Sequence, residues 1–136
     1  ASVVEGNTGT RDLVFPVTLS ATSGAAVTVQ FATSNGTATA GTDYVAQNGT
    51  LTLPAGATSG TIAIVVNGDT VTEPDETLTV TLSAPSGATL GTASAVGTIT
   101  NDDAAVTLSV ADVTVTEGAS ATLTVTLSGA SGQTIT

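Results

Sequence analysis

Residues 61–82 read TIAIVVNGDTVTEPDETLTVTL and contain two strand patterns separated by an acidic loop. Apolar residues occupy every second position on both sides of the loop, at Ile62, Ile64, Val66, Leu78, Val80 and Leu82. Successive side chains of a strand point to opposite faces, so this period of two predicts strands with one buried face. Asn67-Gly68 is a turn signal between them. The stretch therefore predicts a hairpin whose loop carries carboxylates.

The same alternation extends through the first hundred residues. It recurs at Leu13, Phe15, Val17 and Leu19, at Val27, Val29 and Phe31, and at Leu51 and Leu53. Turn signals such as Asn35-Gly36 and Asn48-Gly49 separate these runs, and no segment has a helical period. We therefore predict an all-β fold, an antiparallel β-sandwich of immunoglobulin-like topology. Pro16 interrupts a strand pattern and predicts an edge strand or a bulge.

The composition argues against several function classes. Eleven Asp and Glu residues face a single basic residue, Arg11, and the net charge is −10. Nucleic acid and anionic membrane surfaces are poor partners for such a chain, and no stretch is apolar enough for direct membrane insertion. The absence of Cys and His excludes a disulfide scaffold, a zinc site and the usual nucleophile systems. Sugar hydrolysis by paired carboxylates needs a cleft with aromatic platforms, and the chain has no Trp. We therefore expect no enzymatic activity.

The carboxylates gather in turns beside glycines, whereas the strand bodies are almost free of charge. The clustered acids are Glu5, Asp43, Asp69, Glu73, Asp75, Glu76, Asp102 and Asp103. Clustered carboxylates repel one another and raise each other's pKa. Calcium removes this conflict because it takes six to eight oxygen ligands in flexible geometry, whereas magnesium requires a tighter octahedron. The pattern predicts calcium as the bound ion, although acids that only keep a surface protein soluble would give the same composition.

An internal repeat divides the chain. Three motifs recur in order: Val4-Glu5-Gly6 as Thr116-Glu117-Gly118, Val17-Thr18-Leu19-Ser20 as Val125-Thr126-Leu127-Ser128, and Ser23-Gly24 as Ser131-Gly132. The second copy has a leading segment, residues 105–112, that the first copy lacks. We predict a sandwich over residues 1–103 without its leading strand, followed by the leading strands of a second, incomplete repeat over 104–136.

Two strands alone cannot bury an apolar face, and an isolated hairpin is marginal in water. Residues 106–136 must therefore pack on the first unit, pair with another chain, or belong to a domain that is cut short. A specific hypothesis is that Val106 to Val110 adds as a strand to a neighbouring subunit.

Several short motifs along residues 1–103 together resemble the Calx-beta motif. They are Glu5-Gly6, Ala32-Thr33, Gly36-Thr37-Ala38, Gly41-Thr42-Asp43-Tyr44, Gly49-Thr50-Leu51, Glu73-Pro74-Asp75-Glu76, Gly97-Thr98-Ile99 and Asn101-Asp102-Asp103. This family occurs in sodium–calcium exchangers, integrin β4 and large bacterial surface proteins. The resemblance implies an antiparallel immunoglobulin-like sandwich that binds calcium at one end.

The resemblance also implies a set of ligands. It comprises Glu5 from the first loop, Asp43 from the Gly-x-Asp-Tyr turn, Asp69, Glu73 and Glu76 with a carbonyl near Val71 from the acidic hairpin, and Asp102 and Asp103 from the exit of the sandwich. Two positions depart from the family pattern. Asn101 and Gly68 stand where the family's strong binders often have acids, which implies fewer ions or weaker binding.

The expected function is that of an extracellular or cell-surface calcium-binding structural repeat of bacterial origin. It would rigidify or link the modules of a surface protein or adhesin, with calcium ions and neighbouring repeats or identical subunits as partners. One alternative is a filament subunit that assembles by strand exchange through residues 104–136. Another is a regulatory calcium sensor in a transporter.

Overall fold

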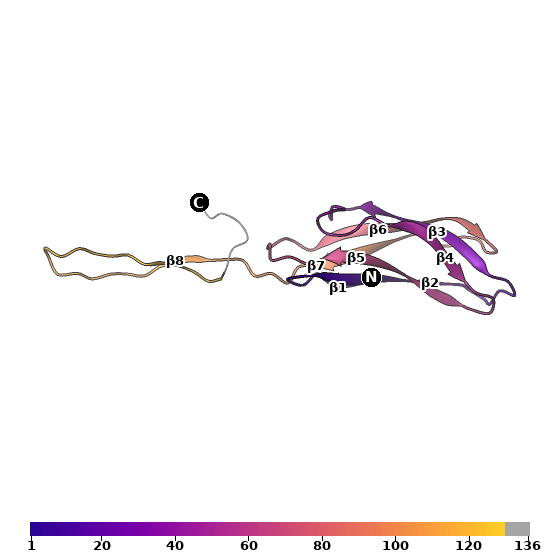
Figure 1. Cartoon of the computed structure of the whole chain (residues 1–136), viewed down its shortest axis with the longest axis horizontal. Coiled ribbons are helices and arrows are strands. Elements are labelled where there is room, and N and C mark those ends of the chain that lie inside the picture. Colours follow the sequence, from indigo (N-terminus) through magenta and orange to yellow (C-terminus); the bar gives the residue numbers. More distant parts are fainter. Residues whose placement is uncertain (130–136) are drawn as a thin grey trace.

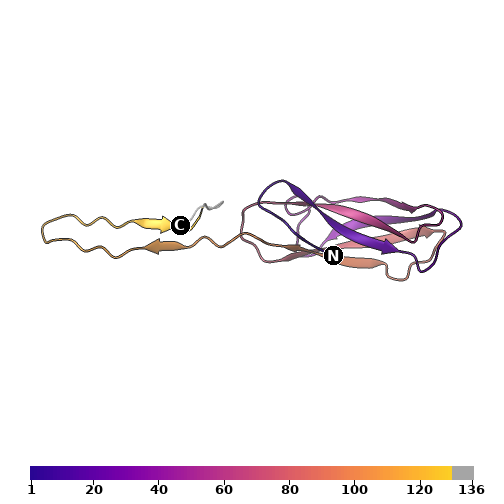
Figure 2. The same cartoon turned by 90° about the horizontal axis from the view of Figure 1, so that it is seen from below.

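The computed structural model describes residues 1–129, so the predicted repeat motif Ser131-Gly132 lies outside the described residues. The described chain contains nine strands and no helix. It forms an elongated two-sheet sandwich from which a thin hairpin projects at one end (Figures 1 and 2). Because residues 1–129 hold no helix at all, none of their elements is a helix suited to crossing a membrane.

Two sheets build the sandwich, and the predicted all-β class is confirmed. The larger sheet has the order β1 (Ser2–Val4), β7 (Ser94–Thr100), β6 (Glu76–Ser86), β3 (Val27–Asn35) and β4 (Asn48–Leu53), and the smaller sheet pairs β2 (Thr10–Thr18) with β5 (Ser59–Asn67). Every pairing inside the sandwich is antiparallel except that of β1 with β7, which is parallel. The sequence did not predict this parallel pair.

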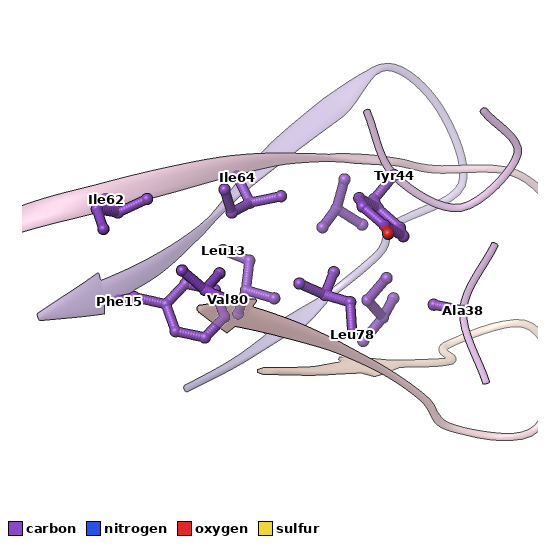
Figure 3. Close-up of a cluster of buried hydrophobic side chains, with 10 residues drawn as sticks. Leu13, Phe15, Ala38, Tyr44, Ile62, Ile64, Leu78 and Val80 are labelled. Atoms are coloured by element: carbon purple, nitrogen blue, oxygen red, sulfur yellow. The ribbon is translucent and has the colours of Figure 1, made fainter. Parts of the chain in front are cut away.

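The inward-facing residues of the two sheets form the core, as the period of two predicted (Figure 3). Leu13, Ile64 and Leu78 are fully buried, and Phe15 is 3% exposed. A Cβ on Gly97 would lie 2.5 Å from Phe15 Cζ, so glycine at this position of β7 lets the two sheets approach. The core is thus built mainly from aliphatic side chains, with Phe15 and Tyr44 as its buried aromatic members.

The turn predicted at Asn48-Gly49 is wrong, whereas the edge strand predicted at Pro16 is confirmed. Asn48-Gly49 does not form the predicted turn, because Asn48 and Gly49 pair with Ala32 and Phe31 at the start of β4. The reversal lies earlier, in residues 36–47, where Gly41 has a φ of 97°. The prediction for Pro16 is confirmed, since β2 pairs only with β5 among the described strands.

The described part of the predicted second repeat does not pair with any strand of the sandwich. β8 (Leu108–Val110) and β9 (Val125–Leu127) pair only with each other, as an antiparallel ribbon. Leu108 is 60% exposed and Val110 is 62% exposed. The hairpin therefore leaves its apolar residues uncovered.

We expect Leu78→Ala to lower the free energy of unfolding by about 2–5 kcal/mol, because it opens a cavity between the sheets. Val96→Ala is the matched control, since Val96 is 57% exposed on the adjacent strand, and we expect it to change stability by less than about 1 kcal/mol. Urea unfolding measures both, and equal losses would contradict this description of the core.

Candidate metal centre

The parallel pair β1 and β7 brings two acidic segments together. Val4 lies opposite Thr100, so Glu5 continues beside the residues that follow β7. The Glu5 amide donates a hydrogen bond to the Thr100 carbonyl at 3.1 Å. Segments at the two ends of the sandwich sequence therefore meet at the same pole.

Glu5, Asp102 and Asp103 form the first group of carboxylates, here called the exit cluster. One oxygen of each lies within 4.8 Å of the others. Asp102 Oδ1 accepts a hydrogen bond from the Gly6 amide at 3.1 Å, and Asp103 Oδ1 accepts one from the Asn7 side chain. Glu5 is only 5% exposed and Asp103 only 9%.

Two oxygens of the exit cluster lack partners. Glu5 Oε1 and Asp103 Oδ2 are buried and accept no hydrogen bond within the described chain. A buried carboxylate oxygen without a donor or a cation is costly, because it loses its hydration and receives nothing in return. The site therefore fits a cation that would bind both oxygens.

Asp43, Glu73 and Glu76 form the second group, here called the turn cluster. One oxygen of each again lies within 4.8 Å of the others, and all three side chains are half-buried. Asp43 is held on its turn by the Thr39 amide, which donates to Asp43 Oδ2 at 2.7 Å, and by the Asn67 amide, which donates to its carbonyl at 2.9 Å. These bonds fasten the turn to the end of β5.

Tyr44 lies buried beside the turn cluster. Its side chain is 1% exposed and its hydroxyl donates to Asn35 Oδ1 at 2.6 Å. The same oxygen accepts the Ala40 amide at 3.1 Å. Asn35 therefore holds the start of the Asp43 turn against the end of β3.

Asp69 and Val71 lie on the acidic loop between β5 and β6 but outside both clusters. The hairpin predicted for this stretch is wrong, because β5 pairs with β2 whereas β6 pairs with β3 and β7, so the loop joins the two sheets. Asp69 is exposed, and its Oδ1 accepts the Val71 amide at 2.7 Å. Its charge nevertheless raises the pKa of Glu5 and Glu73. The structure thus places Asp69 beside the clusters, and a ligand role for Asp69 or for the Val71 carbonyl stays a prediction.

Asn101 connects the two clusters, a role that sequence reasoning missed. Its Oδ1 accepts the Glu73 amide at 3.2 Å, and its Nδ2 donates to the Asp103 carbonyl at 3.0 Å. Its own amide donates to Asp75 Oδ1 at 3.1 Å. An Asp at this position would lose the amide donor, so the departure from the family pattern keeps the acidic loop between β5 and β6 fastened to the exit of the sandwich.

Close contact with the first loop explains why position 68 is a glycine. A Cβ at this position would lie 2.2 Å from the Gly6 carbonyl oxygen and 2.8 Å from that of Glu5. The Gly68 amide also donates to the Gly9 carbonyl at 2.9 Å. An acid at position 68 would therefore have to push the Glu5 loop away.

Burial and mutual repulsion raise the pKa of three carboxyl groups. The pKa of Glu5 rises from 4.5 to about 7, first because of burial and then because of the charges of neighbouring acids, in the order Asp69, Asp103, Glu73 and Asp102. Burial, followed by a hydrogen bond and the charge of Asp43, raises the pKa of Glu76 to about 7. Burial, followed by Asp43 and Asp69, also raises the pKa of Glu73.

These shifts predict that the cation-free protein loses stability as pH rises. Between pH 4.5 and about 7 the folded protein holds protons on Glu5 and Glu76 that the unfolded chain has released, so the free energy of unfolding falls through this window. Urea unfolding in chelator at pH 5 and pH 8 measures the effect. We expect Glu5→Gln to flatten the profile and Asp12→Asn, an exposed control, to preserve it. Stability that rises from pH 5 to pH 8 would contradict the prediction.

Comparison with known proteins agrees with this architecture. The family model described as the Calx-beta domain matches residues 1–108. The calcium binding domain CBD12 of CALX1.1 superposes with a TM-score of 0.67 and 32% identity over 75% of this chain, which spans 41% of that structure. The apo-form Calx CBD1 domain gives 0.62 and 33%, covering 75% of this chain and 89% of that one.

A third structure, the Calx CBD2 domain, has a TM-score of 0.62 at 16% identity over 74% of this chain and 81% of that one, and supports the fold alone. No curated protein matches the sequence. The family model covers well over half of the residues, and it covers both carboxylate clusters. The chain therefore belongs to the Calx-beta domain family.

Proposed function

We propose that the acidic pole binds calcium, with one ion at the exit cluster and a second at the turn cluster. The observation that carries the proposal is the pair of buried oxygens, Glu5 Oε1 and Asp103 Oδ2, which have no hydrogen-bond partner in the described chain. The similarity to calcium-binding Calx domains supports the choice of ion. Asp69 and the Val71 carbonyl are proposed as further ligands on the acidic loop between β5 and β6.

The donor set favours calcium over other cations. Each cluster offers three carboxylates, and the chain has neither His nor Cys, the ligands that zinc and copper prefer. The carboxylates come from separate loops, which suits the flexible coordination of calcium better than the strict octahedron of magnesium. Bound calcium would replace the protons that Glu5 and Glu76 hold because their pKa is raised.

We propose a structural, non-catalytic role for this ion site. Asp103 is followed within a few residues by the projecting hairpin, so an ion held by Asp102 and Asp103 would restrain the direction in which the chain leaves the sandwich (Figure 1). Residues 104–136 are then the start of a following repeat. Such a module would rigidify or link the units of an extracellular or cell-surface bacterial protein, for example an adhesin.

A second candidate function is subunit assembly through residues 104–136, as in a filament. The exposure of Leu108 and Val110 favours it, because an apolar strand without cover is a common means of pairing with another chain. The two candidates are compatible, since the ion site and this segment are separate.

Excess calcium should raise the melting temperature by about 10 °C or more relative to chelator, because an ion at a hundredfold its Kd adds about 2.7 kcal/mol. Asp103→Asn and Asp43→Asn should reduce the shift, and Asp12→Asn, an exposed acid outside both clusters, should leave it intact. Small-angle scattering should show little change of shape on calcium binding. A melting temperature insensitive to calcium, or equally sensitive to magnesium, would refute the proposed site.

Gly68→Ala should weaken calcium binding, because its Cβ would displace the Gly6 and Glu5 carbonyls and with them the Glu5 carboxylate. Gly24→Ala is the control, since a Cβ there would meet nothing within 4 Å. We expect calcium titration calorimetry to give at least a tenfold higher Kd for Gly68→Ala and an unchanged Kd for Gly24→Ala. An unchanged Kd for both variants would show that the close contact does not position the site.

A further inference from the structure

The ladder between β6 and β7 ends at the acidic pole. Glu76 lies opposite Ile99, so the same register places Pro74 opposite Asn101. Proline has no amide hydrogen, and a ladder cannot continue through it. The strand pairing therefore stops where the acidic loop between β5 and β6 meets the exit of β7.

Side chains take over where the ladder stops. Asn101 Oδ1 accepts a hydrogen bond from the Glu73 amide at 3.2 Å, and Asp75 Oδ1 accepts one from the Asn101 amide at 3.1 Å. The two bonds run in opposite directions between the same two segments, as the bonds of an antiparallel pair do. The acidic loop is thus held to the exit of β7 through Asn101.

The same side chain also reaches the exit cluster. Asn101 Nδ2 donates a hydrogen bond to the Asp103 carbonyl at 3.0 Å. Asp103 belongs to the exit cluster and Glu73 to the turn cluster. Because Oδ1 and Nδ2 belong to one planar amide, a displacement of the Glu73 main chain is transmitted to the main chain of Asp103.

This connection matters because each cluster has to hold carboxylates that repel one another. An ion bound between them restricts the segment that carries them. A segment that is already restricted costs less conformational entropy when a second ligand has to order it. Ordering of the Asp103 segment by one ion would therefore prepare the Glu73 segment for the other, and the reverse would hold as well.

We propose that Asn101 is a positioning residue that couples the two clusters, so that calcium bound at either one raises the affinity of the other. The inference deepens the function proposed above and rests on calcium binding at both clusters. The coupling has to be reciprocal, since both affinities change by the same factor. Direct repulsion between two cations acts in the opposite direction, so a positive coupling is evidence for the Asn101 connection.

Each cluster has a main-chain amide that reports on its occupancy. The Gly6 amide donates to Asp102 Oδ1 at 3.1 Å in the exit cluster, and the Thr39 amide donates to Asp43 Oδ2 at 2.7 Å in the turn cluster. Calcium bound by either carboxylate would change the environment of its amide. The two amide signals in NMR spectra therefore give separate Kd values for the two clusters.

A double-mutant cycle with calcium titration tests the coupling. Asp43→Asn disables the turn cluster, so the Kd read at Gly6 then belongs to the exit cluster alone. We expect Asp43→Asn to raise this Kd at least about fivefold in the otherwise native chain and less than about twofold in the Asn101→Ala background. A merely structural Asn101 would weaken both sites without changing the factor. The same factor in both backgrounds would overturn the inference.

Two further variants sharpen the cycle. Asn7→Ala is the matched control, since Asn7 bonds the Asp103 carboxylate, and we expect it to raise the Kd at Gly6 while the effect of Asp43→Asn persists. Asn101→Asp replaces Asn101→Ala if the alanine variant does not fold. It keeps an acceptor for the Glu73 amide but has no donor for the Asp103 carbonyl, so it should also remove the coupling. Coupling that survives Asn101→Asp would contradict the inference.

Hydrogen exchange at the Glu73 amide gives an independent measurement with Asn101 unchanged. In the Asp43→Asn protein, calcium at the exit cluster should slow this exchange at least about fivefold, because Asn101 accepts the hydrogen bond of that amide. An unchanged rate would overturn the inference. If the signals of Gly6 and Thr39 ignore calcium in the unaltered chain, the proposed ion sites fail and the coupling fails with them. Calcium binding at both clusters without coupling would refute this inference alone.

Discussion

The parallel pairing of β1 with β7 is the constraint on which the acidic pole depends. It joins two segments almost a hundred residues apart, so that Glu5 leaves one strand beside Asp102 and Asp103, which leave the other. An antiparallel pairing would send Glu5 to the opposite end of the sandwich. Three paired residues thus determine whether the exit cluster exists. The turn cluster depends in a similar way on the hydrogen bond between Asp43 and Asn67 at the end of β5.

The same pairing brings carboxylates close together, so they repel one another in the folded protein. Burial of the core residues stabilises the fold. Repulsion among the acids gathered at one pole offsets part of that stabilisation. Without a cation, the protein relieves the repulsion by holding protons, as the raised pKa values of Glu5 and Glu76 show. A divalent ion relieves it without protonation, so ion binding and folding are linked. Asn7 donates a hydrogen bond to the Asp103 carboxylate, and Asn101 bonds to the main chain of Glu73 and Asp103, so both residues help to position the acidic segments.

Much of this arrangement follows from sequence, and the remainder depends on contacts between distant residues. The alternation of Ile62, Ile64 and Val66 predicts a strand directly, and the acids beside glycines predict an ion site. The pairing of β1 does not follow, because Ser2–Val4 is too short to show a pattern. The bracing by Asn101 is equally hidden, since its bond to the Glu73 amide spans 28 residues. At Asn48-Gly49 the sequence predicts a turn that does not form. The dipeptide favours a turn, but pairing with Ala32 and Phe31 overrides that preference.

The two ends of the sandwich differ in kind, and this difference gives the molecule a direction. One end gathers the charge and continues into the hairpin of β8 and β9, and the pocket at the other end is lined by apolar residues such as Phe15, Val17 and Leu82. Only two residues separate Asp103 from Val106. An ion bound by Asp103 would therefore restrict the angle at which residues 106–110 leave the sandwich, although it touches none of them. Calcium bound at the exit cluster would therefore act on the geometry of the chain that follows the sandwich.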